Sequence, residues 1–524
     1  MMEKNMFNIK TLLATASACL VLGLSSAQAQ VVTLSSNDGT FSMTGNLIGF
    51  DGDNYELSSV IGNLNLNVND VICEGADCPD LLADLAEFAI AGSNTIGSQM
   101  MPTMIEAYAF DLGGDLEVEV LAGDVVKYTI LDANGEMYST ITLNLGSSDD
   151  AFAALQAKEA YIGLSSRRVT DGERSRFLRN GLGNLTSPEQ ERILALDGLA
   201  VSVNPRNPIQ TLSLSQISDI FAGNVLNWRE VGGLDAPISI YRRDAASGAT
   251  QVFERLVMAP NRKLLSNTAF ISEDNADVSD AVAGDRNAIG IVSLADQRNA
   301  QTLALRSVCG QVASPSNFSV KTEEYPMSRR MFMYVNGGNL PVKVAEFMDF
   351  VTSDAAQDIV ERSGFISQNV SEASLDEQGR RLAHALMAER DLGSLELLQE
   401  MVAGLQDAER ISLTFRFKSG SVEPDNRARV DIDRLAEMVR RGDFEGKRLM
   451  IIGFADSIGA INENQRLSQA RAESVRDALV EAIGLSNLGT VQFTPFGYGK
   501  LSPIGCNETE DGRDSNRRVE IWVR

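Results

Sequence analysis

An aspartate, an asparagine and an arginine near the end of the chain have the types and spacing of a site for a small zwitterion. Asn464 and Arg471 are seven residues apart, which is two helical turns, so a helix places them on one face. Asp456 lies in the loop that leads into this predicted helix, residues 462–483. A carboxylate can hold an ammonium group, and a guanidinium can hold a carboxylate in a two-pronged contact. The alternative is an Asp–Arg ion pair that binds no ligand.

The motifs around these residues resemble the OmpA-like peptidoglycan-binding domain over the whole of residues 411–524. The matching segments are Phe415-Arg-Phe with Ser419-Gly-Ser, Gly453-x-x-Asp456-Ser-x-Gly459, Asn464-x-x-Leu-Ser-x-x-Arg471-Ala, Gly497-Tyr-Gly and Gly512-Arg-x-x-Asn-Arg-Arg-Val-Glu520. Several ordered motifs at the spacing of one family make this resemblance specific.

The resemblance also implies a role for each of these polar residues. Asp456 and Arg471 would grip the free ends of diaminopimelate in a peptidoglycan stem peptide, and Asn464 would assist. Arg518, or its neighbour Arg517, would line the same groove. One departure is visible, since the family's usual His-Thr before the aspartate is Phe-Ala in this chain.

Three short loops in the middle of the chain carry hydroxyl groups, and each stands just before a predicted helix. They are Gly92-Ser-Asn-Thr95, Gly146-Ser-Ser148 and Ser247-Gly-Ala-Thr250. A helix N-terminus offers unpaired N–H donors and a partial positive charge, which suit an oxyanion. Arg243, four residues before Ser247, adds a two-pronged donor. Any one loop is explained by ordinary helix capping, but together they predict an anion site.

These loops resemble those of the type 2 periplasmic binding proteins of the phosphate-binding class, over residues 85–370. Supporting segments are Ile162-Gly-Leu-Ser-Ser-Arg167, Asp219-Ile-Phe-Ala-Gly-x-x-x-x-Trp228, Arg243-Asp-Ala-Ala-Ser-Gly-Ala-Thr250 and Tyr325-Pro-Met-Ser-Arg329. The resemblance implies two α/β lobes joined by a hinge, with an oxyanion such as phosphate clamped between them. The residues expected to contact the anion are Ser93, Thr95, Ser148, Ser166, Arg243, Ser247 and Gly248.

Two departures from this class bear on selectivity. The family's Ser-Gly-Thr is Ser247-Gly-Ala here, so Thr250 comes one residue late. Well-studied phosphate binders place an aspartate where this chain has Ser166, and that aspartate accepts the proton of the ligand. Because a carboxylate repels a fully ionised anion such as sulfate, its loss predicts a weaker preference for phosphate over sulfate.

The segments around these residues define the predicted architecture, an α/β multidomain protein. Residues 1–29 read as a signal peptide, with a basic start, an apolar stretch and an Ala-Gln-Ala cleavage site. A small N-terminal β module is expected at 30–84, a two-lobed clamshell at 85–370, and a helical spacer at 371–408. An OmpA-like β/α sandwich is expected at 409–524.

Charge and hydropathy narrow the choice of partners. The chain of 524 residues has a formal net charge of −25, and residues 31–150 contain the single base Lys127. Such a surface repels phosphate backbones, so nucleic acid is excluded as a partner. No stretch after the signal reaches the ~18 apolar residues of a membrane helix, so the mature protein is not expected to span a membrane.

Cysteines and the single histidine limit the chemistry that the chain can perform. Cys73 and Cys78 flank a short acidic loop, and in an exported protein they predict a local disulfide. Cys309 and Cys506 are either free or paired across domains. The only histidine, His384, lies in the predicted spacer, so no metal site, cofactor site or catalytic triad is expected.

The sequence therefore predicts a binding protein that is not an enzyme. It is expected in the periplasm, on the outer-membrane side of the envelope, holding an oxyanion and attached non-covalently to peptidoglycan. The alternative is a structural envelope protein whose clamshell binds protein partners and no small ligand. The altered Ser-Gly-Ala loop favours that alternative, whereas the retained Arg243 and hydroxyl groups oppose it.

Overall fold

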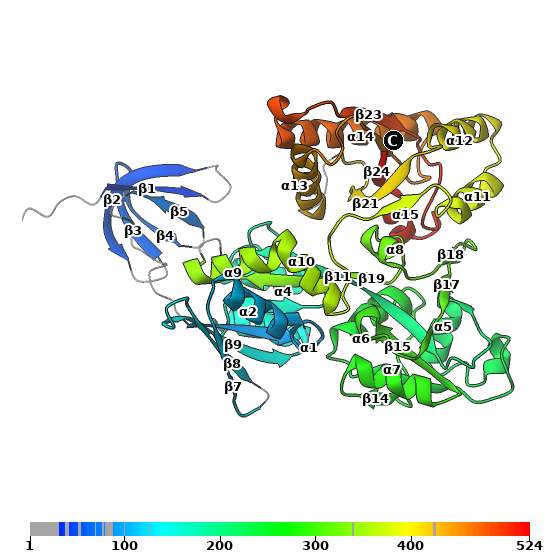
Figure 1. Ribbon diagram of the computed structural model, residues 1–524, viewed down its shortest axis with the longest axis horizontal. Coiled ribbons are helices and arrows are strands. Elements are labelled where there is room, and N and C mark those ends of the chain that lie inside the picture. Colours follow the sequence, from blue (N-terminus) through cyan, green and yellow to red (C-terminus); the bar gives the residue numbers. More distant parts are fainter. Residues whose placement is uncertain are drawn as a thin grey trace, which may run out of the picture. The chain divides into compact units, whose positions relative to one another are not determined.

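The computed structural model describes ten ranges of the chain, and they form two compact units (Figure 1). The described residues are 31–36, 41–50, 54–68, 70–75, 78, 87–98, 100–123, 125–337, 340–422 and 426–524. One unit ends at Pro79 and the other begins at Asp80. The predicted signal peptide, residues 1–29, lies outside the described ranges. Within these ranges, no helix has the length and apolar character needed to cross a membrane.

The first unit is a five-stranded antiparallel sheet with the strand order β4-β3-β2-β1-β5. Its strands are β1 (Val31–Ser36), β2 (Ser42–Phe50), β3 (Asn54–Ser59), β4 (Gly62–Asn67) and β5 (Val71–Glu74). Alternate residues point to one buried face, on which Leu34, Tyr55 and Leu57 are almost fully buried. A disulfide between Cys73 and Cys78 closes the loop that follows β5.

The first lobe of the clamshell is a mixed sheet, with parallel pairings in its middle and antiparallel ones on both sides of them, and helices pack against it around a hydrophobic core. Its elements are β6 (Glu87–Ser93), α1 (Asn94–Gly97), α2 (Met100–Asp111), β7 (Leu116–Val120), β8 (Val126–Leu131), β9 (Met137–Gly146), α3 (Ser148–Gln156), β10 (Ile162–Ser165), α4 (Asp171–Arg179), α9 (Val342–Thr352) and α10 (Asp354–Arg362). Strand β6 pairs in parallel with both β9 and β10, so the three strands end at the same edge. The loops after β6 and β9 therefore meet beside the cleft.

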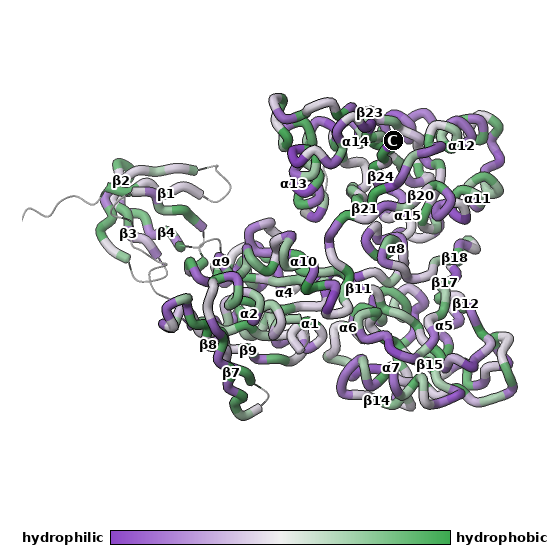
Figure 2. The backbone as a smooth tube through the Cα atoms, viewed as in Figure 1, coloured by the Kyte–Doolittle hydropathy of each residue, from purple (hydrophilic) through white to green (hydrophobic). Residues whose placement is uncertain are grey.

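The second lobe repeats this arrangement around its own core. Its elements are β12 (Thr211–Ser213), α5 (Leu214–Phe221), η1 (Trp228–Val231), β13 (Ser239–Arg243), α6 (Gly248–Phe253), η2 (Glu254–Met258), β14 (Phe270–Ser272), α7 (Asn275–Gly284), β15 (Ala288–Ser293), η3 (Leu294–Asp296), β16 (Gln301–Thr302), β17 (Ala304–Arg306), β18 (Val312–Ala313) and α8 (Asn317–Lys321). Strand β15 is mostly apolar, and all of its residues are buried. Figure 2 shows the hydropathy of the elements along the chain.

Two long strands connect the lobes. Strand β11 (Glu191–Val203) pairs through its first half with β19 (Ser328–Val335) and through its second half with β15. The two lobe sheets are thereby parts of one eleven-stranded sheet. A buried ion pair between Asp197 and Arg329, at 2.6 Å, fixes the middle of this connection. The predicted α/β fold class, with a two-lobed clamshell, is confirmed.

The C-terminal part is a five-stranded sheet with the order β20-β21-β24-β22-β23. Its strands and helices are β20 (Glu372–Ser374), α11 (Gly379–Ala388), α12 (Leu392–Gly404), β21 (Glu409–Arg416), α13 (Asn426–Arg441), β22 (Arg448–Gly453), α14 (Ile461–Ile483), η4 (Leu485–Asn487), β23 (Gln492–Gly497), α15 (Glu510–Asn516) and β24 (Arg518–Val523). Helices α13 and α14 cover one face of the sheet, where Leu413, Ile451 and Val475 share a core.

The prediction of a spacer at 371–408 is wrong. Strand β20 adds to the edge of the C-terminal sheet by pairing with β21, and α11 and α12 cover its second face. Leu382 and Leu398 of these helices pack in one core with Ile452 and Trp522. The apolar side chains of the segment are buried on the sheet, so the segment is part of the C-terminal domain and no extended tether separates it from the clamshell.

The C-terminal domain is bonded to the second lobe of the clamshell. A disulfide joins Cys309, in the turn between β17 and β18, to Cys506, which precedes α15. Ion pairs lie in the same interface, with Arg410 at 2.5 Å from Glu324 and Arg427 at 2.9 Å from Glu323. The second lobe and the C-terminal domain are therefore one mechanical unit.

We predict that the interdomain disulfide contributes substantially to the stability of this unit. The disulfide closes a loop between residues that are 197 positions apart, and replacing both Cys309 and Cys506 by serine restores the conformational freedom of that loop in the unfolded chain. The loss should be about 2–5 kcal/mol in the free energy of unfolding. Both tryptophans of the chain, Trp228 and Trp522, are buried in the linked domains, so fluorescence during urea denaturation reports the transition.

The matched control is the removal of the local disulfide by Cys73→Ser and Cys78→Ser, in the other unit. That variant should leave the tryptophan transition at its wild-type midpoint. Equal midpoints for the wild type and the Cys309/Cys506 variant would contradict the prediction.

Candidate functional site

A cavity of about 460 Å³ lies where the loops of the two lobes meet. Helices α1, α3 and α6 all begin at its wall. Its lining residues are Ser93, Asn94, Thr95, Leu145, Gly146, Ser147, Ser148, Arg243, Asp244, Ala246, Ser247 and Gly248. Six of the seven residues that the sequence predicted as anion contacts are thus brought together, and three helices begin at the same cavity, where their first N–H groups have no partner within the helix.

The seventh predicted contact, Ser166, lies beneath the wall. Its backbone N–H donates to the Ser148 hydroxyl at 3.0 Å, and the two hydroxyl oxygens are 3.3 Å apart. Both side chains are fully buried. Ser166 therefore positions Ser148, and the carboxylate that lines the cavity is Asp244, on a residue that the sequence analysis did not single out.

Two buried donors at the cavity have no partner among the described residues. The Ser247 hydroxyl accepts and donates no hydrogen bond, although the residue is only 5% exposed. The Nε of Arg243 is also unpartnered, and its Nη2 is 3.8 Å from the half-exposed Asp244. Because a buried donor without a partner costs about 1–3 kcal/mol, this arrangement favours a ligand that accepts hydrogen bonds.

Asp244 itself is held mainly by the backbone, and its ion pair with Arg243 is a long one, at 3.8 Å. Its Oδ1 accepts the N–H groups of Ala246 and Ser247, at 2.7 and 3.1 Å. These bonds turn the loop so that Ser247 becomes the first residue before α6, with its side chain free of any capping bond. The positive charge of Arg243 consequently remains available at the cavity.

The lobes touch across the cleft beside this cavity. The nearest atom to a Cβ built on Gly248 is the Ser166 hydroxyl oxygen, at 2.0 Å, so only glycine allows this approach. Gln251, one turn further along α6, accepts from Nε of Arg167 at 2.8 Å and donates to Asp149 at 3.2 Å. These hydrogen bonds among Arg167, Gln251 and Asp149 were not predicted from the sequence, because they join residues of two different lobes.

Around Asp456, the structure brings together most of the other predicted cluster. Oδ1 of Asp456 accepts the N–H of Ile458 at 2.9 Å, and its Oδ2 accepts from Nη1 of Arg517 at 2.7 Å. Asn464 donates to the backbone carbonyl of Asp456 at 3.2 Å. The loop is thus fixed to the start of α14, as its sequence position suggests.

Arg471 lies on the same buried side of α14, but no carboxylate of the described residues pairs with it. Its guanidinium donates to the carbonyl oxygens of Lys418, Ser421 and Phe454 and lies over the ring of Phe417. Burial lowers the pKa of Arg471 to about 10, and the neighbouring Arg517 acts in the same direction. The group is therefore still charged at neutral pH, and within the described ranges its charge is balanced by carbonyl oxygens and not by a carboxylate.

Arg518 does not lie in this cluster. It is fully buried between Glu520, at 2.7 Å, and the ring of Phe454, at 4.0 Å from the ring centroid. Consecutive residues of a strand point to opposite faces, so Arg517 takes the place beside Asp456 that was predicted for Arg518. The Arg518 side chain supports the loop from behind.

Comparisons with known proteins assign both parts of the chain. Residues 130–355 match the model of the PBP superfamily domain, and residues 415–517 match the OmpA family model. The chain is therefore a fusion of a domain of the PBP superfamily with an OmpA-family domain, as predicted from its motifs.

Individual relatives match one part each. The phosphate-binding protein PstS of Borreliella burgdorferi is 24% identical over 49% of this chain and 88% of its own length. Outer membrane protein A of Bordetella avium is 36% identical over 21% of this chain, and the match spans about half, 52%, of that protein.

Among solved structures, an ABC-type phosphate transport receptor from Vibrio cholerae is 23% identical with a TM-score of 0.42, covering 53% of this chain and 99% of that chain. The peptidoglycan-associated lipoprotein from Burkholderia pseudomallei is 22% identical with a TM-score of 0.19, covering 21% of this chain and 89% of that chain.

We predict that Gly248→Ala holds the lobes apart. The added methyl group would collide with the buried hydroxyl groups of Ser166 and Ser148, at 2.0 and 2.8 Å, and the Cβ of Ser166, at 3.3 Å, leaves little room even after the hydroxyl rotates. Small-angle scattering should show a larger radius of gyration for the variant. Gly284→Ala is the matched control, because nothing lies within 4 Å of its Cβ. Equal radii for both variants would contradict a closed cleft.

Proposed function

We propose that this protein is a periplasmic receptor for a phosphate-like oxyanion and that its OmpA-family domain anchors it non-covalently to peptidoglycan. The observation that carries the first half is the pair of unpartnered, buried donors on Ser247 and Arg243 at the meeting point of three helix N-termini. A small oxyanion has enough acceptor atoms to satisfy these donors together.

The anchoring half of the proposal rests on the charges around Asp456. Arg471, on α14, offers a buried positive charge that no carboxylate of the described residues pairs with. Asp456, in the loop that leads into α14, offers a carboxylate. Together they suit the ammonium and carboxylate ends of diaminopimelate in a stem peptide. The Asp456–Arg517 ion pair must then open or share its carboxylate when the ammonium group binds.

The domain content supports this reading over an enzyme. PstS and OmpA, which the two parts resemble, are named as a binding protein and an outer membrane protein. We place the mature chain in the periplasm, exported by the predicted signal at 1–29. The alternative is a clamshell that contacts proteins and holds no small ligand. That alternative does not explain why the Ser247 hydroxyl and the Arg243 Nε are buried without hydrogen-bond partners.

Calorimetry on the full chain tests the anion site. Phosphate binding should be lost in Arg243→Ala, since removing one partner of a buried charged contact commonly costs 2–5 kcal/mol, or about 30-fold and more. The matched control is Arg229→Ala, because Arg229 is an exposed arginine of the same lobe. Sulfate should compete measurably, because Ser166 brings no carboxylate to the cavity, and the Asp244 carboxylate that lines it is half exposed to solvent and already accepts the N–H groups of Ala246 and Ser247. Absence of binding to both anions in the wild type would favour the protein-contacting alternative.

Co-sedimentation with diaminopimelate-containing peptidoglycan tests the anchor. We expect Asp456→Asn to abolish most of the sedimentation of the full chain, because the neutral amide keeps the loop geometry but loses the charge that holds an ammonium group. Arg471→Ala should do the same, and Arg476→Ala, on the exposed side of the same helix, should not. Undiminished sedimentation of the Asp456→Asn/Arg471→Ala double variant, with its fold intact by circular dichroism, would refute the anchor.

A further inference from the structure

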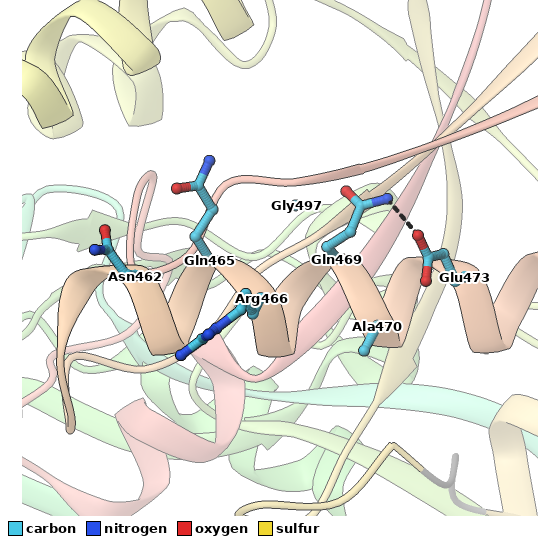
Figure 3. Close-up of a pocket in the computed structure, with 7 residues that line it drawn as sticks. All are labelled: Asn462, Gln465, Arg466, Gln469, Ala470, Glu473 and Gly497. Carbon is cyan, nitrogen blue, oxygen red and sulfur yellow. Dashed lines mark hydrogen bonds between the residues drawn. The ribbon is translucent and has the colours of Figure 1, made fainter.

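A second groove lies on the outer surface of α14, outside the two sites described above (Figure 3). Its volume is about 480 Å³, close to that of the cavity between the lobes. Its lining residues are Asn462, Gln465, Arg466, Gln469, Ala470, Glu473 and Gly497. From Asn462 to Glu473 the helix rises ~16 Å, so the groove is long enough for an extended oligomer.

This groove is distinct from the site around Asp456. Asn464, Ser468 and Arg471 are buried on the inner side of α14, whereas Asn462 and Gln465 are exposed on its outer side. The two surfaces meet at the N-terminal end of the helix, because Asn462 and Gln465 flank Asn464, which is bonded to Asp456. If one branch of a polymer is bound at Asp456, a second branch can reach this groove by passing around the N-terminal end of α14.

The floor of the groove is formed by a close approach of strand β23 to the helix. A Cβ on Gly497 would lie 2.3 Å from the backbone nitrogen of Gln469, so a glycine is required at this contact. Ala470 adds little bulk on the helix side. Gly497 leaves room beside Gln465 and Gln469, whereas Ala470 lies on the other side of the helix in this view (Figure 3).

The walls of the groove are rich in amides. The Gln465 and Gln469 side chains stand next to one another on the same side of α14 (Figure 3). The Gln469 amide is held in place, since its Nε2 donates to Glu473 at 2.9 Å and to the Pro495 carbonyl at 3.4 Å. Gln469 therefore presents its amide oxygen as an acceptor, whereas the Gln465 amide presents a donor and an acceptor together, and this set matches hydroxyl and N-acetyl groups.

The charges of the groove argue against an ionic ligand. Arg466 and Glu473 contribute opposite charges, and no other lining residue is charged. None of the lining side chains is large and apolar, so the groove does not suit a hydrophobic helix or a lipid either. A neutral polymer that carries hydroxyl and amide groups fits this lining best.

We propose that this groove binds the glycan strand of peptidoglycan, a chain of N-acetylated amino sugars. The inference rests on the proposed anchoring function and extends it from the stem peptide to the polymer backbone. The stem peptide is held at Asp456 and Arg471 on one side of α14, and the sugar chain is held by Gln465 and Gln469 on the other. Contacts to both components bind the wall with an avidity that neither site has alone.

The test separates the two ligands on the full chain. The probes are peptide-free glycan strands, released from peptidoglycan by an amidase, and a free diaminopimelate-containing stem tripeptide. Gln465→Ala/Gln469→Ala should weaken glycan binding about tenfold, because two hydrogen-bonding side chains are lost. Its affinity for the tripeptide should stay at the wild-type value. Arg476→Ala/Asp477→Ala, which removes an exposed ion pair of the same helix without changing net charge, is the control for both probes.

Asp456→Asn should show the opposite pattern, with tripeptide binding lost and glycan binding kept. A wild-type chain that binds no glycan, or an amide variant that binds glycan as the wild type does, would overturn the glycan groove. Loss of glycan binding in the amide variant of a chain that never binds the tripeptide would support the groove and refute the stem-peptide site.

Discussion

A network of buried charges joins the clamshell to the C-terminal domain and determines how the two parts of the chain dock. Glu520 of β24 is fully buried and lies 2.7 Å from Arg381 and 2.7 Å from Arg518. Glu324, on the clamshell, reaches into the same cluster through Arg410. Burial acts to raise the pKa of Glu520, but these arginines outweigh it and hold that pKa well below its ordinary value. Removing one partner would leave a buried charge uncompensated, so the network stabilises a single docking geometry.

This docking has consequences for how the two sites work together. The second lobe is joined to the C-terminal domain by the Glu324–Arg410 ion pair and by the Cys309–Cys506 disulfide, so the anion cavity and the Asp456 site are parts of one bonded assembly. The same network reaches the other site, because Arg518 stacks on Phe454, two residues before Asp456. Under the proposed function, this arrangement predicts that the protein holds its anion at the wall, because segment 371–408 is folded onto the C-terminal sheet and forms no extended tether.

Local patterns allowed much of the fold to be predicted, and long-range packing accounts for the rest. The helix predicted at 462–483 is α14, Ile461–Ile483, because its buried residues repeat every three to four positions. The sequence pattern of segment 371–408 predicts a spacer, because charged residues and the pair Gly393-Ser394 interrupt the apolar positions of α12. In the structure, Asp391 caps the start of α12 by accepting from Ser394 at 2.8 Å, so the pair marks a helix start. The choice between Arg517 and Arg518 depends on strand register, and Gln251 becomes recognisable only when the lobes face each other.

The central claim is that one chain holds an oxyanion and the cell wall at the same time. The direct measurement is to sediment the full chain with purified peptidoglycan in the presence of radiolabelled phosphate and to quantify protein and label in the pellet. The account predicts stoichiometric phosphate in the pellet with wild-type protein, and protein without phosphate in the pellet with Arg243→Ala. Wild-type protein that pellets without phosphate, or phosphate that releases the protein from the wall, would contradict it.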